Sequence, residues 1–180
     1  MIPNGVSSVH SIFASDTFNI VSAKNLQETI PVDQAKSIID SFNAQKLLLA
    51  WWVGPHSSHY KVYEVLLSMG LEHVETEVEM AALAQNIDSH VTSMPDNYKI
   101  KEVESLQDFR DYGNVMASVF EPFDKEAVIF YETIGGFYKK DPNGDMFVGY
   151  INNYPVAICF CMKADEIGEV YDIVTYPDFQ

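Results

Sequence analysis

Asp172 is the residue whose sequence surroundings point most directly to chemistry. It lies in EVYDIVT, residues 169–175, a stretch that predicts a β-strand. Alternation along a strand places Asp172 on one face with the apolar Val170 and Val174. The other face then carries Tyr171, Ile173 and Thr175. A carboxylate on an apolar face is unfavourable unless it is paired or functional, and burial disfavours its charged form, which suits a general base.

Two alternatives for this strand stay open. Asp172 also fits a solvated carboxylate near the strand end, or one that is hydrogen-bonded to neighbouring backbone. Glu169, at the start of the strand, is a second candidate base. We therefore treat Asp172 and Glu169 as the candidate catalytic residues for proton removal.

Other sequence signatures of catalysis are absent. There is no GxxxxGK[ST], GxGxxG, HExxH or GxSxG motif. His56 and His59 form an HxxH pair with no further ligand nearby in the sequence, so we interpret them as surface or capping residues and predict no metal site. Cys159 and Cys161 are two apart on a predicted strand, which places both thiols on one face and favours free core thiols over a disulfide.

The composition narrows the classes of partner. The chain has 180 residues, 47% of them hydrophobic, and a net charge of −15. An acidic surface repels phosphate backbones and anionic lipid, so we expect neither nucleic acid nor a membrane as partner. The charge is compatible with a cationic substrate such as an amine, although solubility is the simpler interpretation. The free cysteines and the lack of a signal-peptide pattern favour a cytoplasmic location.

The C-terminal half carries a strong pattern of elements. Residues 98–103 predict a strand, and Ser105 with Asp108 three residues later predicts a capped helix. A second helix is predicted over residues 125–138, and two apolar strands joined by Asn152-Asn153 predict a hairpin. With the strand that contains Asp172, the order is β-α-α-β-β-β.

The N-terminal half is less regular. It predicts a helix from Pro31 to Phe42, a buried strand over residues 46–55, a helix over residues 60–69 and a half-buried strand over residues 71–80. Trp51 and Trp52 are adjacent, so they face opposite sides of their strand, and we interpret them mainly as core residues rather than ligand-stacking ones. A polar linker at residues 89–97 separates the halves. The chain is thus predicted to be a mixed α/β (α+β) protein of two units, 1–95 and 96–180.

The C-terminal pattern resembles one known family. The block MFVGYINNYPVAICFCMKADEIGEVYDIVTYPDFQ, residues 146–180, resembles the middle of GNAT-superfamily N-acetyltransferases, in its hairpin and in the segment IVTYPDFQ. The family's order of one strand, two helices and three strands is similar to residues 98–175. The stretch WWVGPHSSHYKVYEVLLSMGLEHVETEVEMA is similar to the degenerate N-terminal copy of two-unit GNAT proteins. Together the similar regions span residues 47–180.

The resemblance implies a cofactor and a site. The backbone of Ile173, Val174 and Thr175 would bind the pantetheine arm of acetyl-CoA, and Gln180 would begin the loop that holds the pyrophosphate at a helix N-terminus. The family often takes its general base from this strand, which supports Asp172 and Glu169. Because residue 180 would open that loop, we expect the chain to be an incomplete, inactive fragment of the enzyme or a short non-catalytic relative.

The sequence leaves three hypotheses for function. The leading one is an acetyl-CoA-dependent N-acetyltransferase acting on an amine of a small molecule or protein. The alternatives are a non-enzymatic GNAT-like module that binds a ligand or protein, and a plain interaction protein. We also expect an exposed apolar sheet edge at residues 170–175, which either the strand around residues 47–53 or a second copy of the chain would cover.

Overall fold

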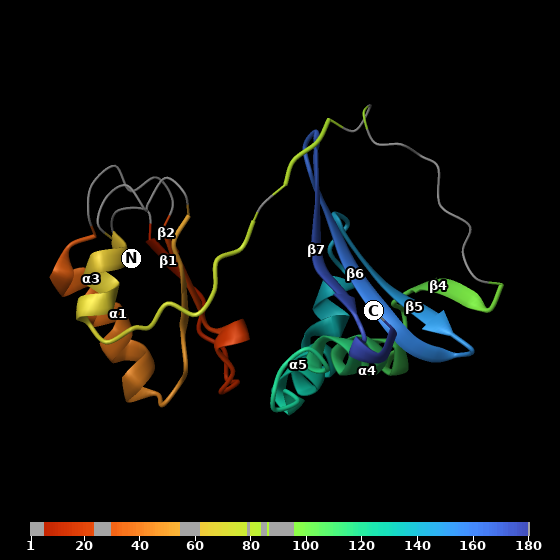
Figure 1. The fold of residues 1–180 in the computed structure, drawn as a ribbon, viewed down its shortest axis with the longest axis horizontal. Helices are drawn as coiled ribbons and strands as arrows, with labels where there is room; N and C mark the ends of the chain where they lie inside the picture. The colour runs from red at the N-terminus through yellow and green to blue at the C-terminus, as the bar shows by residue number, and fades with distance from the viewer. Residues whose placement is uncertain are drawn as a thin grey trace. The chain divides into compact units, whose positions relative to one another are not determined.

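The structure, a computed structural model, describes residues 6–23, 30–54, 62–78, 80–83, 86 and 96–179. The chain divides into two compact units, Met1–Ala82 and Leu83–Gln180 (Figure 1). Each unit contains its own β-sheet and its own helices, so the fold class is mixed α+β as the sequence predicts.

The N-terminal unit is built on a small three-stranded sheet in the order β1-β2-β3. β1 (Val6–Ser8) pairs antiparallel with β2 (Ile20–Ala23), after a short 3-10 turn at Asp16–Phe18. β2 pairs in parallel with β3 (Ala50–Trp52). The helix α1 (Val32–Ala44) connects these two parallel strands, and α3 (Val62–Ser68) follows β3.

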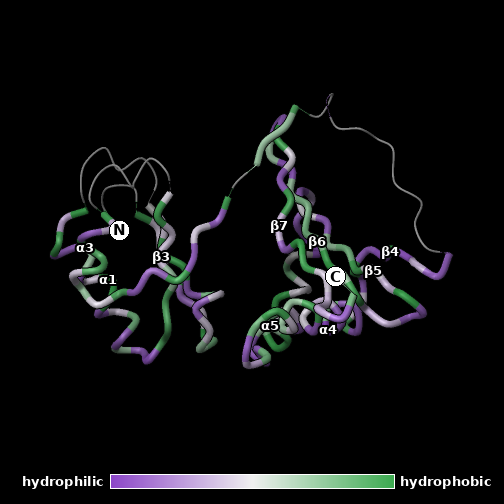
Figure 2. Tube along the Cα trace, viewed as in Figure 1, coloured by the Kyte–Doolittle hydropathy of each residue, from purple (hydrophilic) through white to green (hydrophobic). Residues whose placement is uncertain are grey.

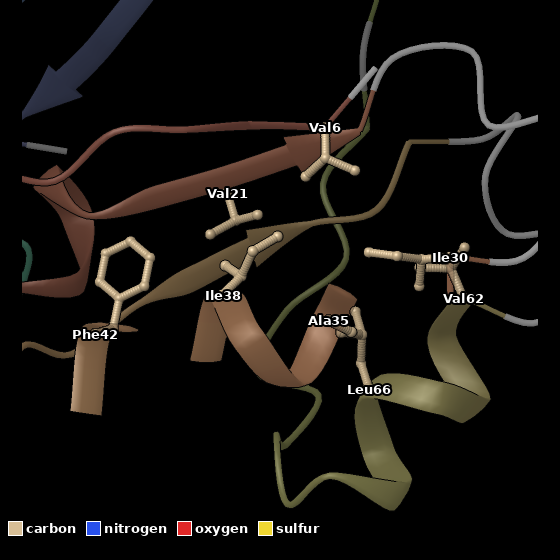
Figure 3. Packing of buried hydrophobic residues seen from close by; sticks show 8 residues of the cluster. All are labelled: Val6, Val21, Ile30, Ala35, Ile38, Phe42, Val62 and Leu66. Atoms are coloured by element: carbon tan, nitrogen blue, oxygen red, sulfur yellow. The ribbon is translucent and has the colours of Figure 1, made fainter. Parts of the chain in front are cut away.

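One hydrophobic cluster holds this unit together. The residues of α1 that are buried recur at three- and four-residue intervals, Ala35, Ile38 and Phe42, as an amphipathic helix requires. Figure 3 shows them packed with side chains from the strands and from α3. The whole buried cluster is Val6, Val21, Ile30, Ala35, Ile38, Phe42, Val62 and Leu66.

The strand predicted over residues 46–55 is present but shorter, as the three residues of β3, with Leu47, Leu49, Trp51 and Val53 packed against the core cluster. Trp52 is 48% exposed, so of the two tryptophans Trp51 is the one that packs against the core. A second sequence prediction for this unit is wrong. The segment predicted as a half-buried strand at residues 71–80 has no strand structure where it is described, and Val74 is 89% exposed. Its alternation was out of phase, and its four glutamates leave it too few apolar residues to bury. His56 and His59 lie outside the described residues.

The C-terminal unit has a four-stranded antiparallel sheet in the order β4-β5-β6-β7. The strands are β4 (Tyr98–Glu102), β5 (Gly144–Ile151), β6 (Tyr154–Ala164) and β7 (Ile167–Thr175). Two helices, α4 (Leu106–Ala117) and α5 (Lys125–Tyr138), lie between β4 and β5 in the sequence and pack together over one face of the sheet (Figure 1). A 3-10 turn at Pro177–Phe179 follows β7.

The predicted elements of this unit are confirmed. Ser105 and Asp108 form the capping box of α4, and Asp108 also accepts hydrogen bonds from Lys101 at 2.6 and 2.8 Å. Asn152 and Asn153 both have positive φ, 52° and 65°, as a two-residue hairpin turn requires. Hydrophobic and hydrophilic residues mix along the strands in Figure 2. The last strand of this sheet, β7, lies at its edge.

The expected exposed apolar edge is present on β7. Val170, Tyr171 and Ile173 are all exposed, and β6 is the strand that pairs with β7 in the described part of the chain. The strand around residues 47–53, which was expected to cover this edge, instead contributes β3, which pairs with β2.

Candidate functional site

A kink in β7 is the feature on which the candidate site is built. Asp172 has φ of 52°, a left-handed conformation that residues other than glycine seldom adopt, although aspartate tolerates it better than most. The ladder between β6 and β7 shifts its register at this point. Phe160 pairs with Tyr171 and Ile158 pairs with Val174. A single residue of β6 therefore faces two residues of β7, which is a β-bulge.

This bulge corrects the alternation predicted from the sequence. Phe160 and Ile158 are two apart on β6, so their partners Tyr171 and Val174 lie on the same face of β7. Strict alternation would have placed Tyr171 with Ile173 instead. Asp172 and Ile173 lie together opposite Cys159, and the bulge leaves the extra residue out of the ladder.

Two tyrosines bind the Asp172 carboxylate. The phenol of Tyr112, on α4, donates to Oδ2 of Asp172 at 2.9 Å, and the phenol of Tyr131, on α5, donates to the same oxygen at 2.8 Å. The two rings also contact each other, with centroids 4.7 Å apart. Asp172 itself is half-buried, so its apolar position on the strand is satisfied by hydrogen bonds from both helices.

The surroundings of this cluster keep Tyr112 and the neighbouring Cys159 protonated. Burial of Tyr112, the neighbouring Asp172 carboxylate and Tyr131 together raise the pKa of the Tyr112 phenol well above its usual range. Burial, the hydrogen bond with Cys161 and the charge of Asp172 raise the pKa of the Cys159 thiol to about 11. Tyr112 therefore remains a hydrogen-bond donor, and Cys159 remains a thiol, across the physiological pH range.

The two cysteines lie beside this cluster. Their Sγ atoms are 3.7 Å apart, and both thiols are free and half-buried. The sequence prediction of neighbouring free thiols is confirmed, although neither is fully in the core. In the part of the chain that the structure describes, no group of three or more His, Cys, Asp or Glu side chains is arranged to hold a metal ion.

The other residues predicted for the site differ in how exposed they are. Glu169 is exposed near the start of β7 and accepts a hydrogen bond from the Tyr171 phenol. Ile173 is 73% exposed, whereas Val174 and Thr175 are half-buried. Gln180 lies outside the described residues. Asp172 is therefore the predicted catalytic residue that the fold surrounds with polar partners.

Sequence reasoning missed the two tyrosines as part of the site. Tyr112 fits the apolar face of its helix, and Tyr131 lies in an apolar run, so both resemble ordinary core aromatics. They lie 60 and 41 residues from Asp172 along the chain. A signal was available: a buried tyrosine hydroxyl needs a partner, and Asp172 was the aspartate expected within an apolar strand.

Comparisons of the sequence with known proteins find no match, whereas comparisons of the structure do. No family model matches the chain, and no curated protein sequence matches it. Within the described residues, none of the helices is long and apolar enough to cross a membrane.

Solved structures, by contrast, share the fold. A GCN5-related N-acetyltransferase from Kribbella flavida superposes with a TM-score of 0.65 at 14% identity, and the match covers 99% of this chain and 66% of that one. A functionally unknown conserved protein from Staphylococcus epidermidis ATCC 12228 matches with a TM-score of 0.54 at 16% identity, over 93% of this chain and 66% of that one. This chain thus spans 66% of the length of either neighbour. The chain has a GNAT-like mixed α+β fold.

Proposed function

We propose that the protein is an acetyl-CoA-dependent N-acetyltransferase that transfers an acetyl group to an amine of a small molecule or protein. The observation that carries the proposal is the kinked strand β7, in a unit ordered β-α-α-β-β-β whose fold is similar to that of the Kribbella N-acetyltransferase. Because this chain spans 66% of that protein, the activity proposed is that of the full product of the gene.

In this proposal β7 binds the acetyl-CoA. The backbone of Ile173, Val174 and Thr175 would bind the pantetheine arm, next to the bulge that interrupts the ladder opposite Cys159. Gln180 would begin the loop that holds the pyrophosphate. The exposure of Ile173 supports access of a ligand to this part of the strand.

The acceptor amine has to lose a proton before it attacks the thioester, because an ammonium ion is not a nucleophile. Asp172 is the proposed base, with Glu169 as the second candidate on the same strand. Both phenol hydrogen bonds are on Oδ2 of Asp172, and among the described residues no donor to Oδ1 is recorded. Oδ1 is thus the oxygen that would take the proton, while the fold holds Oδ2 in place.

One observation favours a second candidate function, a non-enzymatic GNAT-like module that binds a ligand or protein. Two hydrogen bonds on Oδ2 stabilise the carboxylate as a structural anchor, and an anchor needs no catalytic role. In that case Asp172 shapes β7 without accepting a proton.

Calorimetric titration of acetyl-CoA into this chain and into the full product of its gene tests the proposal. Binding to the full product, with acetylation of an amine detected by mass spectrometry, is the expected result. Absence of binding to both would contradict the acetyltransferase and leave the binding module. Binding to the 180-residue chain as tightly as to the full product would show that the loop proposed to begin at Gln180 contributes nothing to the affinity.

We also propose that the chain forms a homodimer through the edge of β7. β7 is an edge strand of nine residues, and its exposed Val170 and Tyr171 precede the residues proposed to bind acetyl-CoA, so this part of the edge is a template for pairing with another chain. Light scattering should detect a dimer that Val170→Lys converts to a monomer, because a lysine on an edge strand opposes such pairing. A monomer at every concentration would contradict the dimer.

A further inference from the structure

The bulge in β7 is contacted by the two helices, α4 and α5, that pack against the sheet. Asp172 adopts its left-handed conformation without the freedom of a glycine, so this backbone is less stable than an ordinary strand unless other contacts support it. The contacts recorded for its side chain come from α4 and α5, through Tyr112 and Tyr131. We call these three residues the clasp.

The clasp connects three elements at a single atom. Tyr112 is fully buried and Tyr131 nearly so, and both phenols converge on Oδ2 of Asp172 at 2.9 and 2.8 Å. Hydrogen bonds to a carboxylate are stronger than those between neutral groups, and a buried phenol that loses its acceptor is strongly unfavourable. The two rings contact each other, with centroids 4.7 Å apart, and this packing holds both phenol oxygens close to Asp172.

The position of the clasp coincides with the break in the ladder. Between the pairs Phe160–Tyr171 and Ile158–Val174, Asp172 is the residue with positive φ, and Ile173 next to it is exposed. A strand in regular register would place a single residue opposite Cys159 instead of two. Whatever keeps Asp172 in the left-handed conformation therefore maintains the bulge.

We propose that Tyr112 and Tyr131 are positioning residues that maintain the bulge of β7 through Asp172. Resting on the proposed function, the bulged form of β7 is the form to which acetyl-CoA binds. The tyrosines touch neither cofactor nor acceptor in this proposal; they act through the aspartate.

Tyr150 provides a matched control. Its phenol donates to Asp111 on α4 at 2.9 Å, so it makes the same kind of bond between sheet and helix, but from β5. Tyr150→Phe removes one Tyr–Asp hydrogen bond away from β7. The test compares it with Tyr112→Phe and Tyr131→Phe, each checked for folding by circular dichroism.

The first readout is hydrogen exchange in the 180-residue chain, which requires no ligand. Loss of one bond to a carboxylate is expected to raise exchange of the β7 amides about tenfold in Tyr112→Phe or Tyr131→Phe, but not in Tyr150→Phe. Equal exchange of β7 in all three variants would overturn the clasp.

The second readout is the affinity for acetyl-CoA of the full gene product. Each clasp substitution is expected to weaken binding about tenfold, while Tyr150→Phe does not. Asp172→Gly supplies the rescue test, because glycine adopts positive φ freely. In that background neither tyrosine substitution should change affinity further; an undiminished effect would overturn action through Asp172.

Failure of the clasp and failure of the proposed function are distinguishable. If the unmodified protein does not bind acetyl-CoA, the proposed function fails, and hydrogen exchange alone decides whether the tyrosines hold the bulge. If acetyl-CoA binds and the substitutions behave like Tyr150→Phe, the function stands and the clasp is wrong.

Discussion

At the scale of single residues, Asp172 combines an unusual backbone with an unusual side-chain environment. Its φ of 52° and its two phenol donors occur at the same position on an edge strand. A residue there has to tolerate positive φ and also present an oxygen to two buried hydroxyls. Of the amino acids with side-chain oxygens, aspartate and asparagine are the ones that tolerate this backbone best.

Two substitutions of Asp172 test these two demands together. Asp172→Asn keeps an acceptor oxygen and tolerance of positive φ, so we expect a loss of about 1–2 kcal/mol in the free energy of unfolding. Asp172→Val adds strain of about 1–2 kcal/mol and leaves two phenols without this acceptor, so a loss of about 3–5 kcal/mol is expected. Urea unfolding measures both losses, and equal losses would contradict the requirement for the acceptor oxygen together with tolerance of positive φ.

At the scale of elements, α4 and α5 depend on close approach of their backbones. A Cβ at Gly113 would lie 2.8 Å from Val128 Cα, and one at Gly135 would lie 2.3 Å from the Phe109 ring. The pair of helices that carries Tyr112 and Tyr131 is therefore positioned by glycines.

The two adjacent glycines of α5 form a matched pair. Gly135→Ala should lower the free energy of unfolding by about 1–3 kcal/mol, because the buried Phe109 ring has to move. Gly136→Ala meets nothing within 4 Å and should stabilise the helix by up to about 1 kcal/mol. Thermal unfolding gives the sign for each, and a stabilising Gly135→Ala would show that the helices are less closely packed than described.

The junction of β4 and α4 is sensitive to pH through Asp108. Burial by itself would raise its pKa, but the hydrogen bond from Lys101 and those from Ser105 and Glu104 outweigh burial and lower the pKa from the ordinary 3.8 to about 2. Because the pKa is lower in the folded state, the stabilisation is complete above about pH 4 and is lost as the pH falls toward 2.

Asp108→Asn removes this dependence. We expect the difference in unfolding free energy between the unmodified chain and Asp108→Asn to be largest above pH 4 and to shrink toward pH 2. Urea unfolding between pH 2 and 6 measures it, with Lys101→Met as a control that removes the partner charge. A difference that is constant with pH would mean that the hydrogen bonds of Asp108 do not depend on its charge.

At the scale of the whole molecule, charge is the dominant property. A net charge of −15 attracts cations and opposes anions over distances that salt shortens. If the proposed acceptor is a cationic amine, its KM should rise several-fold between roughly 50 and 500 mM salt, where screening lengths fall to a few ångströms. The KM of anionic acetyl-CoA should not rise, and a KM for the amine independent of salt would contradict electrostatic attraction.

The sequence by itself determined the local elements of the C-terminal unit. The capping box of Ser105 and Asp108, the turn of Asn152 and Asn153 and the periodicity of both helices each depend on residues close together in the chain. The same reasoning failed for residues 71–80, where alternation out of phase was interpreted as a strand that has no partner in the described structure. A strand is stabilised by pairing with another segment of the chain, and the alternation of its own residues does not show whether such a segment exists.

The environment of Asp172 depends on contacts between distant segments of the chain. The alternation of residues 169–175 predicted a strand with an aspartate that needs a partner, but the partners, Tyr112 and Tyr131, come from 60 and 41 residues away. The bulge also depends on register, which is set by pairing with β6 rather than by the residues of β7. Local patterns report what a segment prefers, whereas contacts between distant segments arise only when the chain packs, so the candidate residue was predictable and its geometry was not.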